Sequence, residues 1–462
     1  MNRNHEFMEM KECLPEVPAP DFSRAKKRYH RHKVGKQATT TLATSLCAFT
    51  LVVNLFPSVA LAVSRVPFLG ELAKIVDFSS SLSRAVEEEY VQYLGETQTK
   101  DGITVTLKHM IVDAKRVNVF FTAEDSQGNE CYVEPTFVWE GMDEEDTGNS
   151  HLMGDVTVEM DLFSGKTNKD PTLILSKDFF EEVPEEFTLE LRVRGKNTDT
   201  SEENGTALFY SAENLGTSFE FAVIVDPYFL GQGELIEVNQ SFEVDGESIT
   251  VTNMEVYPSH IQITLKEDDN HNKKMKEIEF YLENDKGETF EAITNGQVES
   301  WNSEKPLETT YYLESDFFSK SENITLYIRE VKWLDKDLEK VAVNLEDLTC
   351  DWLPEGVEFI SADLDTERGE GDYALTFRVY NPPVNTGFTT SYTSRSVWDG
   401  SFYTADGQEE GFNGTSYGGD SSDYDTAIYY LPQEFYSEVI YMTPAYTSVT
   451  EFVKNPMEIP LF

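Results

Sequence analysis

One stretch of the sequence has the letters of a nucleophile motif, in which a serine stands at a turn from a strand to a helix. Gly414-Thr415-Ser416-Tyr417-Gly418 matches G-x-S-x-G. The stretch around it is rich in turn residues and shows no helical pattern, and the last histidine of the chain is His271, so no base follows the serine. We therefore expect no catalytic residue here and no enzymatic activity.

Histidine and acidic residues could bind metal ions, but their spacing is not that of a known site. His109, His151, His260 and His271 are far apart and pair with no cysteine, so no zinc motif is present. Acidic runs at 143–149, at 267–272 and at Asp363-x-Asp365-x-Glu367 could offer oxygen ligands to calcium. A net charge of −47 produces such runs by chance, so we expect no metal site and no cofactor.

The chain has four cysteines, which do not form a disulfide framework: Cys13, Cys47, Cys131 and Cys350. For Cys131 and Cys350, which share one side of the span described below, we expect two buried thiols. A bond between them is the alternative.

The charge is divided unevenly along the chain. Residues 1–36 are net basic, and the rest is strongly acidic. Binding of nucleic acid by the acidic part is excluded, because phosphate contacts require basic side chains. Attraction of cations or basic proteins is one interpretation of the acidic surface, and solubility alone is the simpler one.

Residues 37–64 contain no charged side chain and predict a single transmembrane helix, since about 20 residues span the hydrocarbon. Seven basic residues and no acidic one lie between Arg24 and Lys36, which predicts a cytoplasmic N-terminus and extracellular C-terminal domains in the cell membrane. A cleaved signal peptide is the competing interpretation, because Ala60-Leu61-Ala62 has the small-x-small form. The long lead-in disfavours it. Asn54 and Pro57 make the helix locally easy to unwind.

The cytoplasmic segment, residues 1–36, is too short to fold alone. Phe7, Met10 and Leu14 recur at helical spacing and would form one apolar stripe that a partner could bind. The alternative is a disordered tail whose basic residues lie on anionic lipid.

After the span, residues 65–99 predict a juxtamembrane helical stalk. Pro67 suits a helix start, and Phe68, Leu72, Ile75 and Val76 fall on one face. The stretch SSSLSRAVEEEYVQYL predicts a second helix that ends at Gly95.

From residue 100 the apolar period changes to two, which predicts a mainly β ectodomain of tandem immunoglobulin-like β-sandwiches. Ile103-Thr104-Val105-Thr106 recurs as Ile249-Thr250-Val251-Thr252, which indicates a repeat. The expected units are a first sandwich at 100–226, a second at 227–353 and a third, Tyr-rich β unit at 354–462. The tyrosines of the third unit predict either half-buried strand residues or an exposed face that binds sugar or protein.

The order of these segments resembles a Bacillota family of single-pass proteins that contain a domain of unknown function. The resemblance is carried by the span ending in SVALA, by VPFLGELAKIVDF and by the ITVT strand. Such proteins are often encoded beside extracytoplasmic-function sigma factors, and the layout is similar to that of anti-sigma-V-type proteins. It implies a sigma factor held by Phe7, Met10 and Leu14, a first cut at Ala60 and Ala62, and an intramembrane cut near Asn54 and Pro57. The HxxxCxxC motif of zinc-type anti-sigma factors is missing.

Two functions follow as expectations. The first is a membrane-anchored anti-sigma factor that senses an extracellular signal and is released by regulated proteolysis. The second is a cell-surface protein that binds a protein or a cell-wall glycan and uses its span only as an anchor. Under the second, the stripe Phe7, Met10 and Leu14 has no partner.

Overall fold

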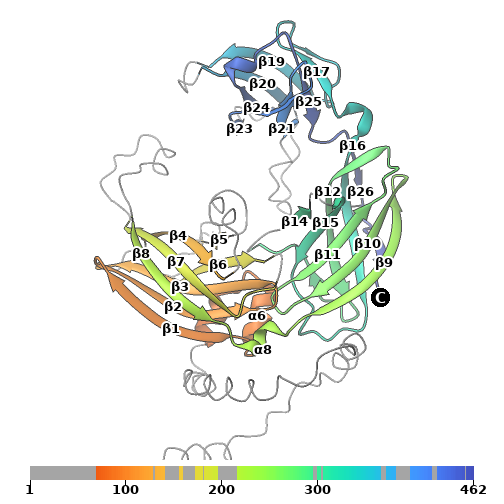
Figure 1. The fold of residues 1–462 in the computed structure, drawn as a ribbon. Helices are drawn as coiled ribbons and strands as arrows, with labels where there is room; N and C mark the ends of the chain where they lie inside the picture. Colours follow the sequence, from red (N-terminus) through yellow and green to blue (C-terminus); the bar gives the residue numbers. More distant parts are fainter. Residues whose placement is uncertain are drawn as a thin grey trace, which may run out of the picture. The chain divides into compact units, whose positions relative to one another are not determined.

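The computed structural model describes residues 69–127, 131–140, 156–159, 172–179, 182–195, 216–294, 299–302, 305–365, 371–380, 396–418, 424–452 and 454–462. This part is mainly β, as expected (Figure 1). The expected cytoplasmic segment 1–36 and the predicted span 37–64 lie outside it. Within the described ranges, no helix is both long enough and apolar enough to cross a membrane.

The expected helical stalk at 65–99 is helical only in part, and it is not a stalk. Helix α5 (Leu69–Ile75) is followed by α6 (Ser80–Glu87), and a strand, β1 (Gln92–Lys100), then begins. The helix stops because Glu89 adopts a φ of 57°, and the next residues include β-branched and aromatic side chains that favour a strand. Both helices bury their apolar side in the core of the first β domain through Leu72, Val76, Leu82, Ala85 and Val86.

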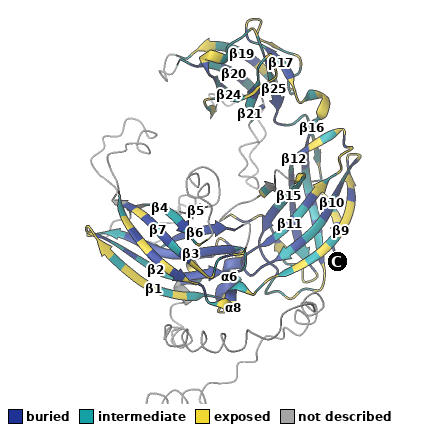
Figure 2. Ribbon diagram, viewed as in Figure 1, coloured by how far each residue is buried: buried dark blue, intermediate teal, exposed yellow. Residues whose placement is uncertain are grey.

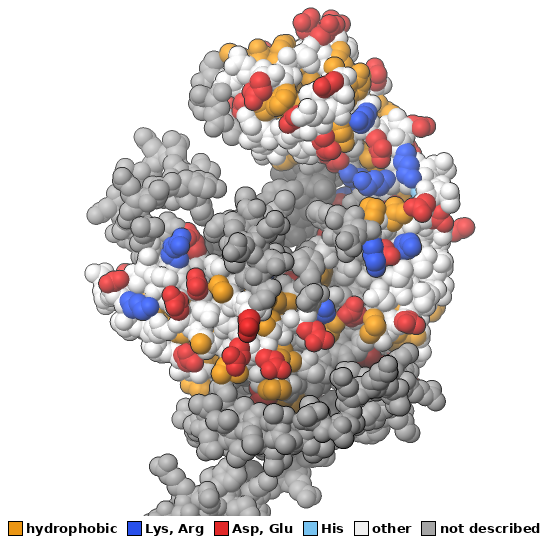
Figure 3. Space-filling model, viewed as in Figure 1, with side chains coloured by type: hydrophobic (Ala, Val, Ile, Leu, Met, Phe, Trp, Pro, Cys, Tyr) orange, Lys and Arg blue, Asp and Glu red, His pale blue; other side chains and the backbone are white. Residues whose placement is uncertain are grey.

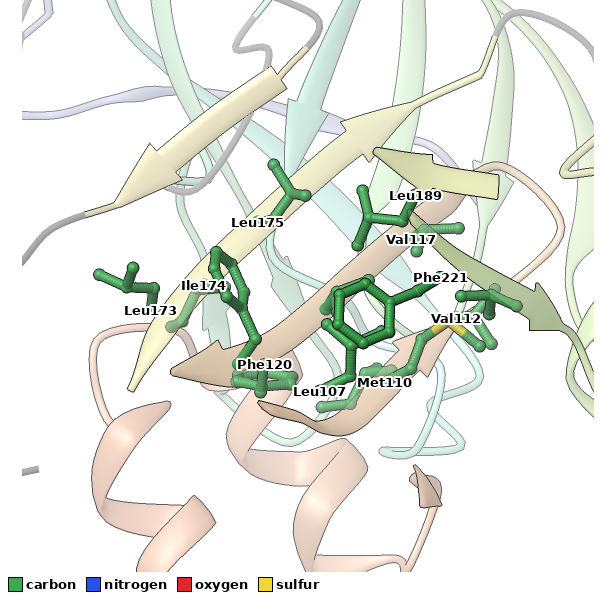
Figure 4. Packing of buried hydrophobic residues seen from close by; sticks show 14 of the residues in the cluster. Leu107, Met110, Val112, Val117, Phe120, Leu173, Ile174, Leu175, Leu189 and Phe221 are labelled. Atoms are coloured by element: carbon green, nitrogen blue, oxygen red, sulfur yellow. The ribbon is translucent and has the colours of Figure 1, made fainter. Parts of the chain in front are cut away.

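The first β domain has two sheets around one core. One sheet has the order β1-β2-β3-β6-β5 and the other β4-β7-β8. Their strands are β2 (Ile103–Val112), β3 (Arg116–Asp125), β4 (Cys131–Val138), β5 (Val156–Glu159), β6 (Leu173–Asp178), β7 (Glu186–Gly195) and β8 (Thr217–Ile224). Figure 4 shows Phe120 and Leu175 of one sheet and Leu189 and Phe221 of the other among the side chains that fill this core.

A short helix, α8 (Pro227–Leu230), leads into the second β domain, which repeats this strand order. Its sheets are β14-β15-β11-β10-β9 and β13-β12-β16-β26, with β27 also paired to β16. The strands are β9 (Glu234–Val244), β10 (Glu247–Val256), β11 (Ile261–Glu267), β12 (Lys273–Asn284), β13 (Thr289–Phe290), β14 (Glu299–Asn302), β15 (Lys305–Leu313), β16 (Ile324–Asp335), β26 (Ser448–Glu451) and β27 (Met457–Pro460). The second domain is therefore a structural copy of the first, with β9, β10, β11, β15 and β14 in the places of β1, β2, β3, β6 and β5.

The two copies also open with the same hairpin. Asp101-Gly102 joins β1 to β2, Asp245-Gly246 joins β9 to β10, and all four residues have positive φ. Asp-Gly in such a two-residue loop matches the twist of the strands it joins. The fourth residue pair from each turn is a cross-strand hydroxyl pair, Thr97 with Thr106 at 3.0 Å and Ser241 with Thr250 at 2.8 Å.

The strand order differs from that of the immunoglobulin fold. An immunoglobulin sheet has the order A-B-E-D, so its second strand neighbours its fifth. Here β1, β2 and β3 are consecutive neighbours joined by tight turns. Sequence periodicity indicates how many strands there are, but it does not determine which strand pairs with which.

The third β domain is inserted into the second. Its strands are β17 (Val341–Asn344), β18 (Thr349–Cys350), β19 (Val357–Leu364), β20 (Tyr373–Tyr380), β21 (Trp398–Tyr403), β22 (Glu409–Gly411), β23 (Thr415–Gly418), β24 (Tyr424–Leu431) and β25 (Val439–Pro444). They form the sheets β18-β17-β25-β21-β22 and β19-β20-β24-β23 around a separate core. Short 3-10 turns lie at Lys336–Leu338 and Gln433–Phe435.

The expected boundary at 353/354 is therefore wrong in two ways. Val341 and Val343, placed in the second unit, pack in the third core because β17 pairs with β25. Ile459 and Leu461, placed in the third unit, are buried in the second core, where β27 pairs with β16. The chain leaves the second domain after β16 and returns at β26, in the connection that joins β7 to β8 in the first domain. Figure 2 shows the buried stretches of each core.

Candidate functional site: the polar junction of the first two β domains

Glu314 of the second domain is bound to the N-terminal end of α6 in the first. It lies directly after β15 and its side chain is 7% exposed. A single carboxylate oxygen, Oε2, accepts hydrogen bonds from the hydroxyls of Ser79 (3.0 Å), Ser80 (3.2 Å) and Ser81 and from the Ser81 backbone N–H (2.6 Å). A buried carboxylate needs such donors, and hydrogen bonds to a charged acceptor are the strong ones.

The local sequence explains why α6 presents these donors. Ser79 is the N-cap, with extended backbone angles, and its hydroxyl accepts a hydrogen bond from Leu82 N–H at 3.2 Å. The hydroxyl of Ser81 in turn accepts one from the backbone N–H of Ser315 at 2.6 Å. Each of the two domains thus donates hydrogen bonds to the other.

A second set of contacts joins Asp113, in the turn after β2, to the turn between β10 and β11. Asp113 Oδ2 accepts from the backbone N–H of Ser259 at 3.0 Å and from its hydroxyl at 2.6 Å, and His260 Nδ1 lies 3.6 Å from the same oxygen. All three residues are at most 2% exposed. Burial raises the pKa of Asp113, but His260, Ser259 and the Lys115 amide favour the carboxylate more, and the net pKa lies below its ordinary value.

Asp, Ser and His are the residue types of a hydrolase triad, but this arrangement is not one. The Ser259 hydroxyl hydrogen bonds to the aspartate, whereas in a triad the histidine stands between serine and aspartate. All three side chains are also closed off from solvent. The geometry therefore joins two domains and offers no nucleophile.

The middle of the junction contains a buried arginine. Arg116 is fully buried and pairs with Asp178 through Nε and through Nη2, the latter at 2.8 Å. Its guanidinium lies 5.7 Å from the ring centre of Tyr312 in the second domain. Among the residues that the structure describes, Nη1 has no hydrogen-bond partner.

The rim of the junction has one ion pair and an aromatic cluster. Arg84 Nη2 of α6 lies 2.6 Å from Glu288 Oε1 of the second domain, and both side chains are partly exposed. Tyr90, which follows α6, contacts the rings of Phe229 at 4.8 Å and Phe318 at 5.7 Å. The residues after the predicted span are thus held by both domains.

The side chains that the sequence singled out for partner binding and processing lie outside the described residues: Phe7, Met10, Leu14, Asn54, Pro57, Ala60 and Ala62. His151, the acidic run 143–149 and Glu367 also lie outside them. His109 is in β2, where burial and then Lys108 lower its pKa to about 4. His271 Nδ1 lies 3.6 Å from Glu267 Oε2. In the described ranges, no three His, Cys, Asp or Glu side chains are placed to hold a metal ion.

The remaining candidate residues are the serine of the G-x-S-x-G stretch, the cysteines and the tyrosines of the third domain. Ser416 lies within β23, so the G-x-S-x-G letters do not form a turn from a strand to a helix. Cys131 and Cys350 are thiols, but only Cys131 is buried as expected, and Cys350 is half-buried. Burial followed by the charge of Asp351 raises the pKa of Cys350 to about 12. The described tyrosines of the third domain are half-buried or buried, which agrees with the first interpretation of that unit. Acidic side chains are spread over the visible face instead of forming one patch (Figure 3).

Two family models match the chain. Residues 30–125 match a "Domain of unknown function (DUF4179)", and residues 233–355 match a "Family of unknown function (DUF5643)". The chain thus carries domains of unknown function, as the resemblance implied. A comparison with curated proteins gives no match. One solved structure, "the conserved domain protein from Bacillus anthracis", is similar over 59% of this chain and 82% of its own, with 12% identity and a TM-score of 0.38.

Proposed function

We propose that this protein is a membrane-anchored regulator whose β ectodomain senses an extracellular signal and whose cytoplasmic segment holds a sigma factor. In this proposal residues 37–64 span the cell membrane and residues 1–36 lie in the cytoplasm. The signal is an extracellular protein or a cell-wall glycan. Release of the sigma factor follows proteolysis at Ala60 and Ala62 and then near Asn54 and Pro57.

The observation that supports a signalling role is the place of α5 and α6. A protein that used its span only as an anchor would need nothing more than a flexible linker after it. Here α5 and α6, at Leu69–Ile75 and Ser80–Glu87, are packed into the first domain, and α6 is also bonded to the second. A movement between the two domains would therefore reach the residues next to the span.

The proposal is tested at the cytoplasmic stripe, because a segment this short must gain its binding energy from apolar side chains ordered on contact. Replacing Phe7, Met10 and Leu14 together by Asp should weaken sigma binding by more than about a hundredfold. Met8→Asp, one residue off the stripe, is the matched control.

The assay uses the full chain as bait in membranes and measures transcription from a promoter that depends on the captured sigma factor. We expect the triple substitution to raise transcription while the protein stays in the membrane at normal abundance. If the wild-type chain captures no sigma factor and transcription is unchanged, the regulator is excluded. The anchored surface protein that binds a protein or glycan is then the better proposal.

A further inference from the structure

We infer that the junction is a separable latch: the second β domain holds α6 in place, and its departure exposes residues 69–91, which follow the predicted span in the sequence. This inference rests on the proposed function for its biological meaning, since it specifies how the ectodomain would control cleavage. Its physical content, which is the selective opening of α6, does not depend on a sigma factor.

Helix α6 divides its contacts between the two domains. Its apolar residues Leu82, Ala85 and Val86 pack in the first core. Its N-cap Ser79 and its residues Ser80 and Ser81 donate to Glu314 of the second domain, and its Arg84 pairs with Glu288 there. One side of α6 thus packs against the first domain, and the other side is hydrogen bonded to the second.

The side of α6 that contacts the second domain is held by polar groups. Hydrogen bonds between two domains are replaced by hydrogen bonds to water when the surfaces part, so their loss costs much less than their number suggests. Separation of an apolar interface of the same size would expose its surface to water, and no new hydrogen bonds would offset that free-energy cost. The Glu314 and Asp113 contacts therefore give a defined geometry while closed and can be exchanged for water, and the cost of exposure comes from apolar contacts such as that of Phe318 with Tyr90.

The two carboxylates and their partners lie at the ends of strands. Glu314 directly follows β15, and Leu313 before it is buried in the second core. Asp113 lies in the turn between β2 and β3, opposite the turn that carries Ser259. Both contacts are fixed to strands of their domains, so a rigid shift of the second domain would remove both at once.

Opening of the junction would destabilise α6. It has only eight residues, and helices this short are not stable in water without tertiary contacts. Without Glu314, Ser81 N–H and three hydroxyls lose their acceptor. Opening should therefore expose α6 before the strands of the first domain open.

The experiment measures hydrogen exchange of the full chain in lipid nanodiscs, with peptides covering 80–91, β2 and β10. Glu314→Ala should speed exchange in 80–91 by about tenfold or more, given the strength of hydrogen bonds to a charged acceptor. Glu237→Ala, an exposed residue of β9, removes the same charge and should change nothing. Exchange in β2 and β10 should stay at the wild-type rate.

A rim variant provides an independent check. Arg84→Glu should also speed exchange in 80–91, and the swapped pair Arg84→Glu with Glu288→Arg should restore protection. Unchanged exchange in Glu314→Ala, or equal acceleration in β2, would overturn the latch, because α6 would then open only with its whole domain. An opened variant that cells still cleave at the wild-type rate would overturn its role in proteolysis, whereas failure to capture a sigma factor affects only the proposed function.

Discussion

Removing residues 457–462 should destabilise the second β domain and leave the third unchanged. The deletion takes away β27 and two side chains of the second core, Ile459 and Leu461, which are 4% and 8% exposed. Burying one such side chain contributes about 1.5–3 kcal/mol, so the loss is about 3–6 kcal/mol. The free energy of unfolding of a domain is only about 5–15 kcal/mol, so the deletion removes a large part of the stability of the second domain.

The assay is urea unfolding followed by hydrogen exchange, which gives a separate midpoint for each domain. With a slope of about 2 kcal/mol per molar urea, the midpoint of β10, β11 and β12 should fall by about 2 M. The midpoint of β20 and β24 should not move. Val449→Ser, which alters an exposed side chain of β26, is the control. If the third domain lost stability instead, the insertion would be refuted and the boundary at 353/354 restored.

Three further predictions concern topology, pH and the inserted domain. Protease added to cells without their wall should degrade the chain after Ser64 and spare a tag at Met1; protection of a C-terminal tag would reverse the orientation. The pKa of His109 is about 4 in the fold and 6.5 in the unfolded chain. Neutral His109 therefore contributes fully to the stability of the first domain above pH 6.5, and this stability is lost as the pH falls toward 4. The first domain should lose about 3 kcal/mol over that range, and His109→Gln should remove this dependence. Replacing residues 337–446 by a short Gly-Ser loop should leave the second domain folded, because Thr447 N–H donates to Trp333 O at 2.7 Å and the two ends of the insertion are adjacent; loss of protection in β16 would contradict this.

The sequence predicted those features that depend on local pattern. Alternation predicted strands, and the recurrence of ITVT predicted a repeat. Strands β2 and β10 do hold the same place in their sheets, but the two tetrads are displaced by two residues, because Ile103 is the first residue of β2 and Ile249 is the third of β10. The helical prediction failed at Tyr90 and Val91, where the serine-rich and glutamate-rich stretch before them still suits a helix. Tyr90 and Val91 are local signals for a change to a strand, and the pairing of β1 with β2 from Gln92 onward, which no local pattern shows, completes it.

The junction could not be predicted because its members are far apart in the sequence. Glu314 and Ser81 are ordinary residues of an acidic, serine-containing chain, and only their meeting gives them a role. One local signal was present, since Ser79 before an apolar-periodic stretch is an N-cap. That signal indicates where a helix begins, and it does not indicate that a carboxylate from another domain binds there.

The insertion also explains why the boundaries of the family match differ from the units of stability. The matched segment 233–355 begins at β9 but ends after β18, inside the third domain. Such a segment would contain β17 without its partner β25, and β16 without β26 and β27. Unpaired strand edges and a missing part of the core are both costly, so a continuous segment does not contain the whole second domain. The stable unit consists of residues 234–335 together with 447–462, and a change at the C-terminus therefore acts on the same domain that holds α6.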